Sequence, residues 1–154
     1  RSLPGEYRGR MSLGAWADKW AGPRQIATTV TVSIDAHPYL IGRGRSIALK
    51  TGANTIHVKG NRPCWPTWTL TPAANAKTVS IKDAHGHTLA VASTTAITGR
   101  ISIITDPDHR ELRVNGNLMA PTLESDYFPL PPGVHTLALT GCAGILTYRP
   151  LTLI

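Results

Sequence analysis

The sequence predicts an all-β protein, an antiparallel β-sandwich or jelly roll. From residue 46 onward, turn signals recur at short, regular intervals, and runs of β-branched and aliphatic residues lie between them. These intervals carry no helical period. Only 16% of the residues are charged, and the chain contains 14 Gly and 12 Pro, a composition that suits strands and turns. Such spacing and composition are typical of sandwich and jelly-roll domains.

The first 25 residues are the least regular part of the chain. Gly5, Gly9 and Gly22 interrupt them, as does Gly14. Trp16 and Trp20 lie four residues apart, and this spacing predicts one short helical turn with both indoles on the same face. We interpret the two tryptophans as a packing patch, against the rest of the chain or against a neighbour, rather than as a ligand platform.

Residues 26–34 form the best strand of the N-terminal third, because they are rich in β-branched residues and contain neither Gly nor Pro. Pro38 ends this region, since proline cannot continue a central ladder. Residues 42–45 are a basic loop without the Gly-Lys-Ser/Thr ending of a phosphate-binding loop. We interpret the loop as a connection or a subunit contact, and we place a boundary there, between residues 1–45 and residues 46–154.

The second unit carries the regular pattern of strands and turns. The expected strands lie at residues 47–50, 55–58, 67–71, 78–81, 88–92, 101–104, 111–114, 135–139 and 145–148. The last two follow a rigid Pro131-Pro132-Gly133 corner and are separated by a reversal at residues 141–144. We therefore predict a terminal hairpin that closes the sandwich.

The net charge of +7 is unevenly distributed. Residues 1–60 hold nine Lys or Arg against three Asp or Glu, whereas residues 61–154 hold seven against six. The cations are scattered rather than gathered in a run with interleaved aromatics, which argues against direct nucleic-acid binding. Charge complementarity to an acidic protein neighbour is the better interpretation.

The cysteine count and the hydropathy pattern predict neither a disulfide framework nor a membrane span. Cys64 and Cys142 are too few for a disulfide framework, and two buried thiols in a reduced compartment fit better than a bridge. No apolar run approaches the roughly 20 residues of a membrane span, and we find no secretory signal. The chain begins at Arg1 rather than Met, which is compatible with a fragment of a longer protein.

Candidate catalytic and metal-binding residues are few, and each has a simpler explanation. His85 and His87 follow Asp83 in a predicted hairpin turn, and they lack further ligands at metal-site spacing. Asp106 and Asp108, with His109, have the composition of a tight turn. No serine-hydrolase, metalloprotease or activated-cysteine pattern is present. We therefore predict no catalytic site, no metal, no cofactor and no enzyme activity.

Trp65 and Trp68 are the most plausible residues for stacking on a sugar. They lie three positions apart, so alternation along a strand would place one of them in the core. One alternative function is therefore that of a monomeric jelly-roll module, which binds host glycans through one of these indoles.

Four segments resemble, in order, the C-terminal domain of siphophage distal tail proteins. Residues 60–70 resemble its Gly-Asn and Pro opening, and residues 83–89 its turn followed by Thr and an aliphatic residue. Residues 98–106 and 110–116 resemble a strand pair that ends in Asn-Gly. Residues 126–133 and 148–150 resemble the closing Phe-x-Leu-x-Pro-Gly and Tyr-Arg. Together they cover about residues 54–150.

The N-terminal part is compatible with the same family. Residues 6–11 and 29–39 resemble the last strands of the ring-forming domain that precedes the sandwich. The resemblance implies a galectin-like sandwich in a homo-oligomer, a hexameric ring at the tip of a non-contractile phage tail. It also implies tail tube and tail tip or baseplate proteins as partners, a place in the virion, and synthesis in the host cytoplasm. The chain lacks the sugar-site pattern of galectins, so the fold does not by itself imply lectin activity.

A ring with cyclic symmetry uses two different patches on each subunit. The basic, tryptophan-bearing residues 1–50 suit that role, so we predict subunit contacts at Trp16, Trp20, Arg24, Arg43 and Arg45. A capsid or tail-tube protein of related fold is a third interpretation, which differs mainly in its partners.

Overall fold

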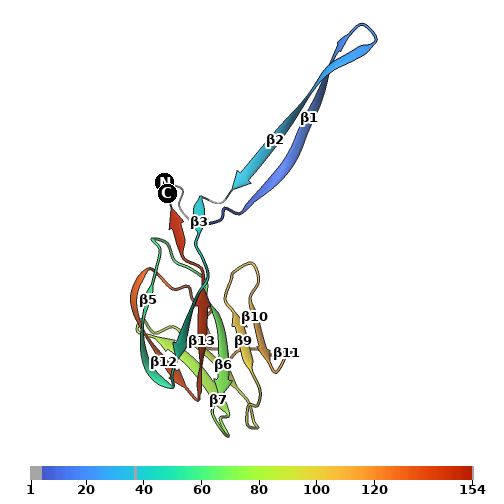
Figure 1. Cartoon of the computed structure of the whole chain (residues 1–154). Helices are drawn as coiled ribbons and strands as arrows, with labels where there is room; N and C mark the ends of the chain where they lie inside the picture. Colours follow the sequence, from blue (N-terminus) through green and yellow to red (C-terminus); the bar gives the residue numbers. More distant parts are fainter. Residues whose placement is uncertain (1–4, 37, 154) are drawn as a thin grey trace.

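The computed structural model describes residues 5–36 and 38–153. The protein consists of a two-sheet β-sandwich and a long β-hairpin that projects from one end of it (Figure 1). The described residues contain strands and no helix, so the all-β prediction is confirmed.

Two antiparallel sheets form the sandwich. The larger sheet has the strand order β11-β10-β9-β6-β13-β4, and the smaller one has the order β5-β12-β7-β8. The larger sheet comprises β4 (Arg45–Leu49), β6 (Thr67–Pro72), β9 (Ile101–Ile104), β10 (Glu111–Val114), β11 (Asn117–Leu118) and β13 (Cys142–Tyr148). The smaller sheet comprises β5 (Gly52–Val58), β7 (Thr78–Asp83), β8 (Thr88–Ala92) and β12 (Gly133–Thr140). All nine strands expected beyond residue 46 are present.

The core lies between the two sheets, because alternate residues of each strand point inward. The largest fully buried side chains include Trp68, Leu70 and Ile103 from the larger sheet and Ile81 and Leu137 from the smaller one. Phe128, in the connection before β12, packs against Trp68 with the ring centroids 6.2 Å apart. The sandwich thus has one continuous core built from both sheets.

The predicted terminal hairpin is wrong in one respect. Its two strands, β12 and β13, are joined by a tight turn at Gly141, but they belong to opposite sheets. β12 pairs with β5 and β7, and β13 pairs with β4 and β6. The C-terminal stretch therefore supplies an interior strand to each sheet, and its turn crosses the sandwich instead of continuing a ladder.

The projecting hairpin consists of β1 (Gly9–Ala21) and β2 (Arg24–Ala36), which pair with each other and with no other described strand. We call this hairpin the arm. The predicted irregular segment with a helical turn at Trp16 and Trp20 is therefore wrong, because both residues lie in β1. A spacing of four places two side chains on one face of a strand as well as of a helix, so it could not distinguish the two structures.

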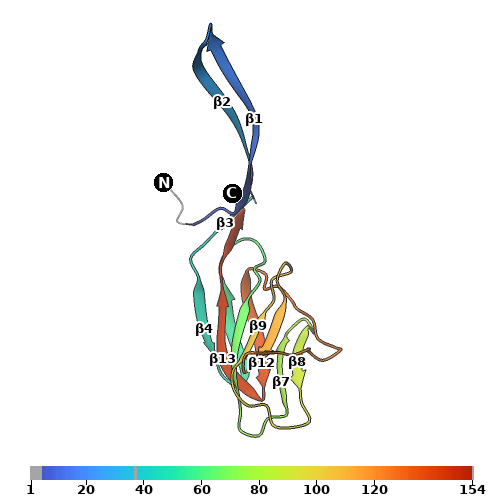
Figure 2. The same cartoon turned by 90° about the vertical axis from the view of Figure 1, so that its right-hand side faces the viewer.

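A short region, the neck, joins the arm to the sandwich; it comprises residues 5–8, β3 (Tyr39–Ile41) and β14 (Leu151–Leu153) (Figure 2). β3 pairs with β14, and Glu6 forms an isolated bridge with Ile41. The Arg149 guanidinium lies 3.0 Å from a Glu6 carboxylate oxygen and donates to the Gly42 carbonyl at 3.0 Å. Segments from both ends of the chain thus meet in the neck.

Candidate functional site

The arm carries its apolar side chains on one face. Cross-strand partners in an antiparallel pair point to the same side, and neighbours along a strand alternate. The register pairs Met11 with Ile34, Leu13 with Val32 and, beyond a bulge, Trp16 with Val30, which places all six on one side. We call these six residues the apolar face of the arm: Met11, Leu13, Trp16, Val30, Val32 and Ile34.

The apolar face is largely open to solvent. Ile34 is 69% exposed, Met11 and Trp16 are each 67% exposed, and Leu13 is 63% exposed. A soluble protein rarely exposes a contiguous apolar surface of this kind unless it is an interaction site. An isolated two-stranded hairpin is also marginally stable by itself. Both arguments indicate that another surface covers the arm.

The opposite face of the arm carries mostly polar side chains. Ser12 pairs there with Ser33, Ala17 with Thr29, and Lys19 with Ala27. Sequence reasoning missed most of the apolar face, although Met11 and Leu13, and Val30, Val32 and Ile34, alternate with a period of two. The Gly22-Pro23 pair between these runs was the signal for a hairpin turn.

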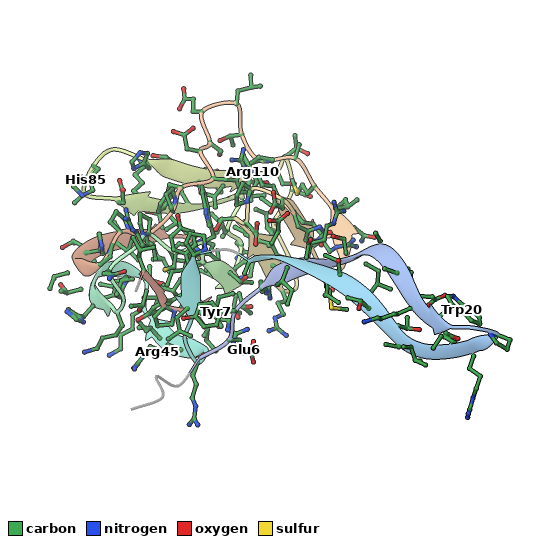
Figure 3. The ribbon with its side chains drawn as sticks, turned by 90° about the horizontal axis from the view of Figure 1, so that it is seen from above. Glu6, Tyr7, Trp20, Arg45, His85 and Arg110 are labelled. Atoms are coloured by element: carbon green, nitrogen blue, oxygen red, sulfur yellow. The ribbon has the colours of Figure 1, made fainter. Side chains whose placement is uncertain are left out.

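The tip of the arm is stiffened by polar contacts and carries free cations. Gln25 Nε2 donates to an Asp18 carboxylate oxygen at 2.9 Å, and the Thr28 hydroxyl donates to the same oxygen at 2.7 Å. Lys19 and Arg24 form no ion pair within residues 5–36 and 38–153. Trp20, also at the tip, is 58% exposed and lies far from the sandwich (Figure 3). The tip therefore presents an indole and two cations to a partner.

A cleft of about 460 Å³ lies where the neck meets the sandwich. We call it the neck cleft. Its walls come from the neck, from the ends of β6 and β13 and from the connection between β9 and β10. They are lined by Arg8, Tyr39, Ile41, Trp65, Thr67, Asp106, Asp108, Thr147, Tyr148, Arg149 and Leu151. The Asp108 backbone N–H donates to Asp106 Oδ1 at 3.0 Å, which is the tight turn predicted for this segment. This turn thus also brings two carboxylates to an aromatic cleft.

The two tryptophans of the glycan prediction have different environments. Trp68 is fully buried in the core, so its indole cannot stack on a sugar. Trp65 is partly exposed and lines the neck cleft. The expectation that one of the pair faces the core is confirmed, and the glycan prediction now depends on Trp65 alone.

The predicted interface arginines lie apart from the arm. Arg43 belongs to the exposed loop between β3 and β4, and Arg45 is the exposed first residue of β4, the edge strand of the larger sheet. Neither forms an ion pair in the part of the chain that the structure describes. Trp16, Trp20 and Arg24 lie together in the arm, so the five predicted contact residues form two separate groups.

The histidine-containing turn is the β7–β8 hairpin connection. Asp83 Oδ1 accepts the backbone N–H groups of His85 and His87, and Asp83 Oδ2 lies 2.7 Å from His87 Nδ1. The hydrogen bond with Asp83 raises the pKa of His87. Burial acts to raise the pKa of Asp83, but these hydrogen bonds outweigh it and lower that pKa. The His87 ring also stacks on Phe128 at 5.5 Å, so the residue organises the turn.

Neither metal ligation nor a membrane-spanning helix is supported by the described residues. They contain no group of three or more His, Cys, Asp or Glu side chains placed to hold a metal ion. A search of the same residues finds no helix with the length and apolar character needed to cross a membrane. Cys64 and Cys142 are buried and unbridged, as predicted. Burial raises the pKa of each thiol to about 11.

A comparison with protein families identifies the sandwich. The family described as "Siphovirus-type tail component, C-terminal domain" matches residues 59–151. The chain belongs to this family. The tail component is thus a structural protein of a siphophage tail, of the distal tail type that the four sequence segments suggested.

Among solved structures, the tail component resembles SPP1 Dit (gp 19.1), described as a paradigm of the hub adsorption apparatus in phages that infect Gram-positive hosts. The two share 17% sequence identity and a TM-score of 0.68 over 93% of this chain. The likeness shows the fold, a galectin-like sandwich with its N-terminal extension. The chain spans 58% of the length of SPP1 Dit. A search of curated proteins finds no match.

Proposed function

We propose that the tail component is a non-catalytic adaptor that forms a ring at the distal end of the phage tail. The ring joins the tail tube to the tip or baseplate proteins that meet the host. Synthesis takes place in the host cytoplasm before assembly into the virion. The observation that carries this proposal is the arm, a hairpin of two 13-residue strands with an uncovered apolar face.

The arm favours a ring over a symmetric pair. It projects from one end of the sandwich (Figure 1), so it can reach a surface of a neighbour other than that neighbour's own arm. Such a heterologous contact generates a closed ring when the rotation between subunits closes. A hexamer is the ring size that the family resemblance implies.

The energetics agree with an assembly role. Burying one Leu, Ile, Met or Val side chain contributes about 1.5–3 kcal/mol. Association costs roughly 4–15 kcal/mol in lost translational and rotational freedom. The six residues of the apolar face can offset the upper end of that cost only if most of them become buried. The whole face, rather than one end of it, is therefore the expected contact.

Light scattering on a size-exclusion column tests the proposal with two matched variants. Leu13→Asp places a carboxylate on the apolar face, and Ser12→Asp places one on the opposite face of the same strand. We expect the wild type and Ser12→Asp to form a discrete oligomer and Leu13→Asp to remain monomeric. A monomeric wild type would contradict the ring and favour the alternative, a glycan-binding module that uses Trp65.

The second group of predicted contacts has its own test. Reversing the charge of Arg43 and Arg45 together, with Arg43→Glu and Arg45→Glu, should weaken the oligomer at least tenfold. Because both side chains are exposed, the unfolding transition of the sandwich should stay unchanged. An unaltered oligomer in the double variant would exclude this edge from the subunit interface.

A further inference from the structure

We propose that the tip of the arm inserts into the neck cleft of the adjacent subunit. Trp20 packs on the apolar floor of the cleft, and Arg24 pairs with Asp106 and Asp108. This inference rests on the proposed ring, because it names the surface that receives the arm.

The arm that occupies the cleft belongs to a second copy in this proposal, because a subunit's own tip cannot reach it. β1 contains 13 residues, and at about 3.3 Å per residue it spans roughly 40 Å. Arg8, just before β1, lines the cleft, whereas Trp20 lies at the other end of the strand. Pairing with β2 from Gly9 to Ala21, interrupted only by two register shifts, keeps the arm extended, so a subunit cannot place its own tip in its own cleft.

The shape and polarity of the cleft suit an indole. Tyr39, Ile41, Trp65 and Leu151 give it aromatic and aliphatic walls. A tryptophan side chain buries about 150–250 Å² on packing, and aromatic pairs contribute about 0.5–1.5 kcal/mol beyond that area. Trp20 is 58% exposed in the isolated subunit, so it has this area available. Tryptophan and arginine are also the residues most enriched at interface hot spots.

The charges of the two surfaces are complementary. Asp106 and Asp108 line the cleft and form no ion pair within the described part of the chain. The cleft also contains two arginines, but Arg149 is engaged by Glu6 and by the Gly42 carbonyl, which leaves Arg8. Two carboxylates thus face one uncommitted cation. Arg24 at the tip of the neighbour's arm would supply a second cation. Its guanidinium matches a carboxylate in bidentate geometry.

Chemical cross-linking tests the contact directly. A full chain carrying both Arg24→Cys and Asp108→Cys is treated with a short bismaleimide at pH 7. Cys64 and Cys142 give little background, because they are buried and their thiol pKa of about 11 leaves almost no thiolate. We expect a ladder of covalent oligomers that ends at the ring size. The matched control carries Arg24→Cys with Lys77→Cys on the sandwich, and it should give no ladder.

A charge exchange provides the second measurement. Arg24→Glu alone should weaken assembly at least tenfold, and adding Asp108→Arg in the same chain should restore it to within about threefold of wild type. The inference is overturned if the wild type assembles but the cysteine pair gives no more ladder than its control. It is also overturned if the exchange restores nothing, or if the cleft of the assembled ring binds glycans and Trp65→Ala abolishes that binding.

The two proposals fail in different ways. If the wild type stays monomeric, the ring itself is wrong. If Leu13→Asp abolishes the oligomer while the cross-link and the charge exchange both fail, the arm forms the ring but docks elsewhere. The first result removes the function, and the second removes only the cleft as the receiving surface.

Discussion

The sandwich and the arm are both antiparallel β-structure, but they place their apolar side chains in opposite ways. In the sandwich, Trp68 and Leu137 are fully buried between two sheets. In the arm, Trp16 and Ile34 are about two-thirds exposed on a single ribbon. The same alternation of side chains therefore buries the apolar residues of the sandwich within one subunit. It leaves the apolar residues of the arm available to a neighbour. Substitutions in the sandwich should change folding, and substitutions in the arm should change assembly.

The largest expected difference is between two tryptophans. Trp68→Ala opens a cavity in the core and should lower the free energy of unfolding by about 3–5 kcal/mol. Trp16→Ala removes an exposed side chain and should change the unfolding of the monomer by no more than about 0.5 kcal/mol, while weakening the oligomer. Urea unfolding of dilute protein, with light scattering at higher concentration, separates the two effects. A destabilised Trp16→Ala monomer would show that the arm is part of the sandwich's cooperative unit.

Two glycines sharpen the same comparison. A methyl group on Gly144 would overlap the Thr69 carbonyl oxygen and lie 2.8 Å from the Leu70 Cα, both backbone atoms of the adjacent strand β6. Gly144→Ala should therefore cost about 1–3 kcal/mol, the range of an overpacked core. Gly14→Ala in the arm meets its nearest atom, the Thr31 carbonyl oxygen, at 3.3 Å. Thermal unfolding should separate the two variants by several degrees, and equal transition temperatures would contradict the packing around β13.

Much of the sandwich could be predicted from the sequence, because burial imposes a regular pattern on it. Strands such as β6 and β9 alternate between more and less buried residues. Turn residues such as Asn115-Gly116, which adopt positive φ at both positions, mark where the strands end. The pairing of strands was not predictable in the same way. The Gly141 turn permits either a hairpin or a crossing between sheets, and only the packing of Leu137, Leu139 and Leu146 in one core selects the crossing.

The candidate site was harder to predict, because it depends on surfaces that the isolated chain leaves uncovered. Trp16, Trp20 and Arg24 were identified from residue type. The strand predicted at residues 26–34 is present as part of β2, but β1, which carries both tryptophans, was not predicted. The neck cleft joins Arg8 and Tyr39 to Trp65 and Asp108. These residues are distant in the sequence, and no local spacing connects them.

A smaller effect concerns a hydrogen bond between the two sheets. The Tyr148 hydroxyl, on β13, accepts the Lys59 backbone N–H at 3.2 Å and donates to the His57 carbonyl on β5 at 3.3 Å. Tyr148→Phe should cost about 0.5–1.5 kcal/mol, the net value of a typical hydrogen bond. Tyr7→Phe, on an exposed side chain of the neck, should cost nothing measurable. Equal urea midpoints for the two variants would show that the hydrogen bonds of the Tyr148 hydroxyl add no stability.

The smallest expected effect is a pH dependence at the turn between β7 and β8. Asp83→Asn keeps an Oδ1 atom that can accept the two backbone N–H groups of the turn, but it removes the charge that faces His87. Because the pKa of His87 is raised in the folded protein, the contribution of His87 to the free energy of unfolding is complete below about pH 6.5. It is lost as the pH rises through the raised pKa. Because the pKa of Asp83 is lowered in the folded protein, the contribution of Asp83 to the free energy of unfolding is complete above about pH 3.8. It is lost as the pH falls through the lowered pKa.

The pair therefore stabilises most between about pH 4 and pH 6.5. Because the His87 side chain is 47% exposed, solvent screens the pair and the effect should stay below about 1 kcal/mol. We expect Asp83→Asn to be less stable than wild type at pH 5 and nearly equal to it at pH 9, with a lower His87 pKa by NMR titration. A stability difference that does not change between these pH values would mean that Asp83 acts through the turn alone.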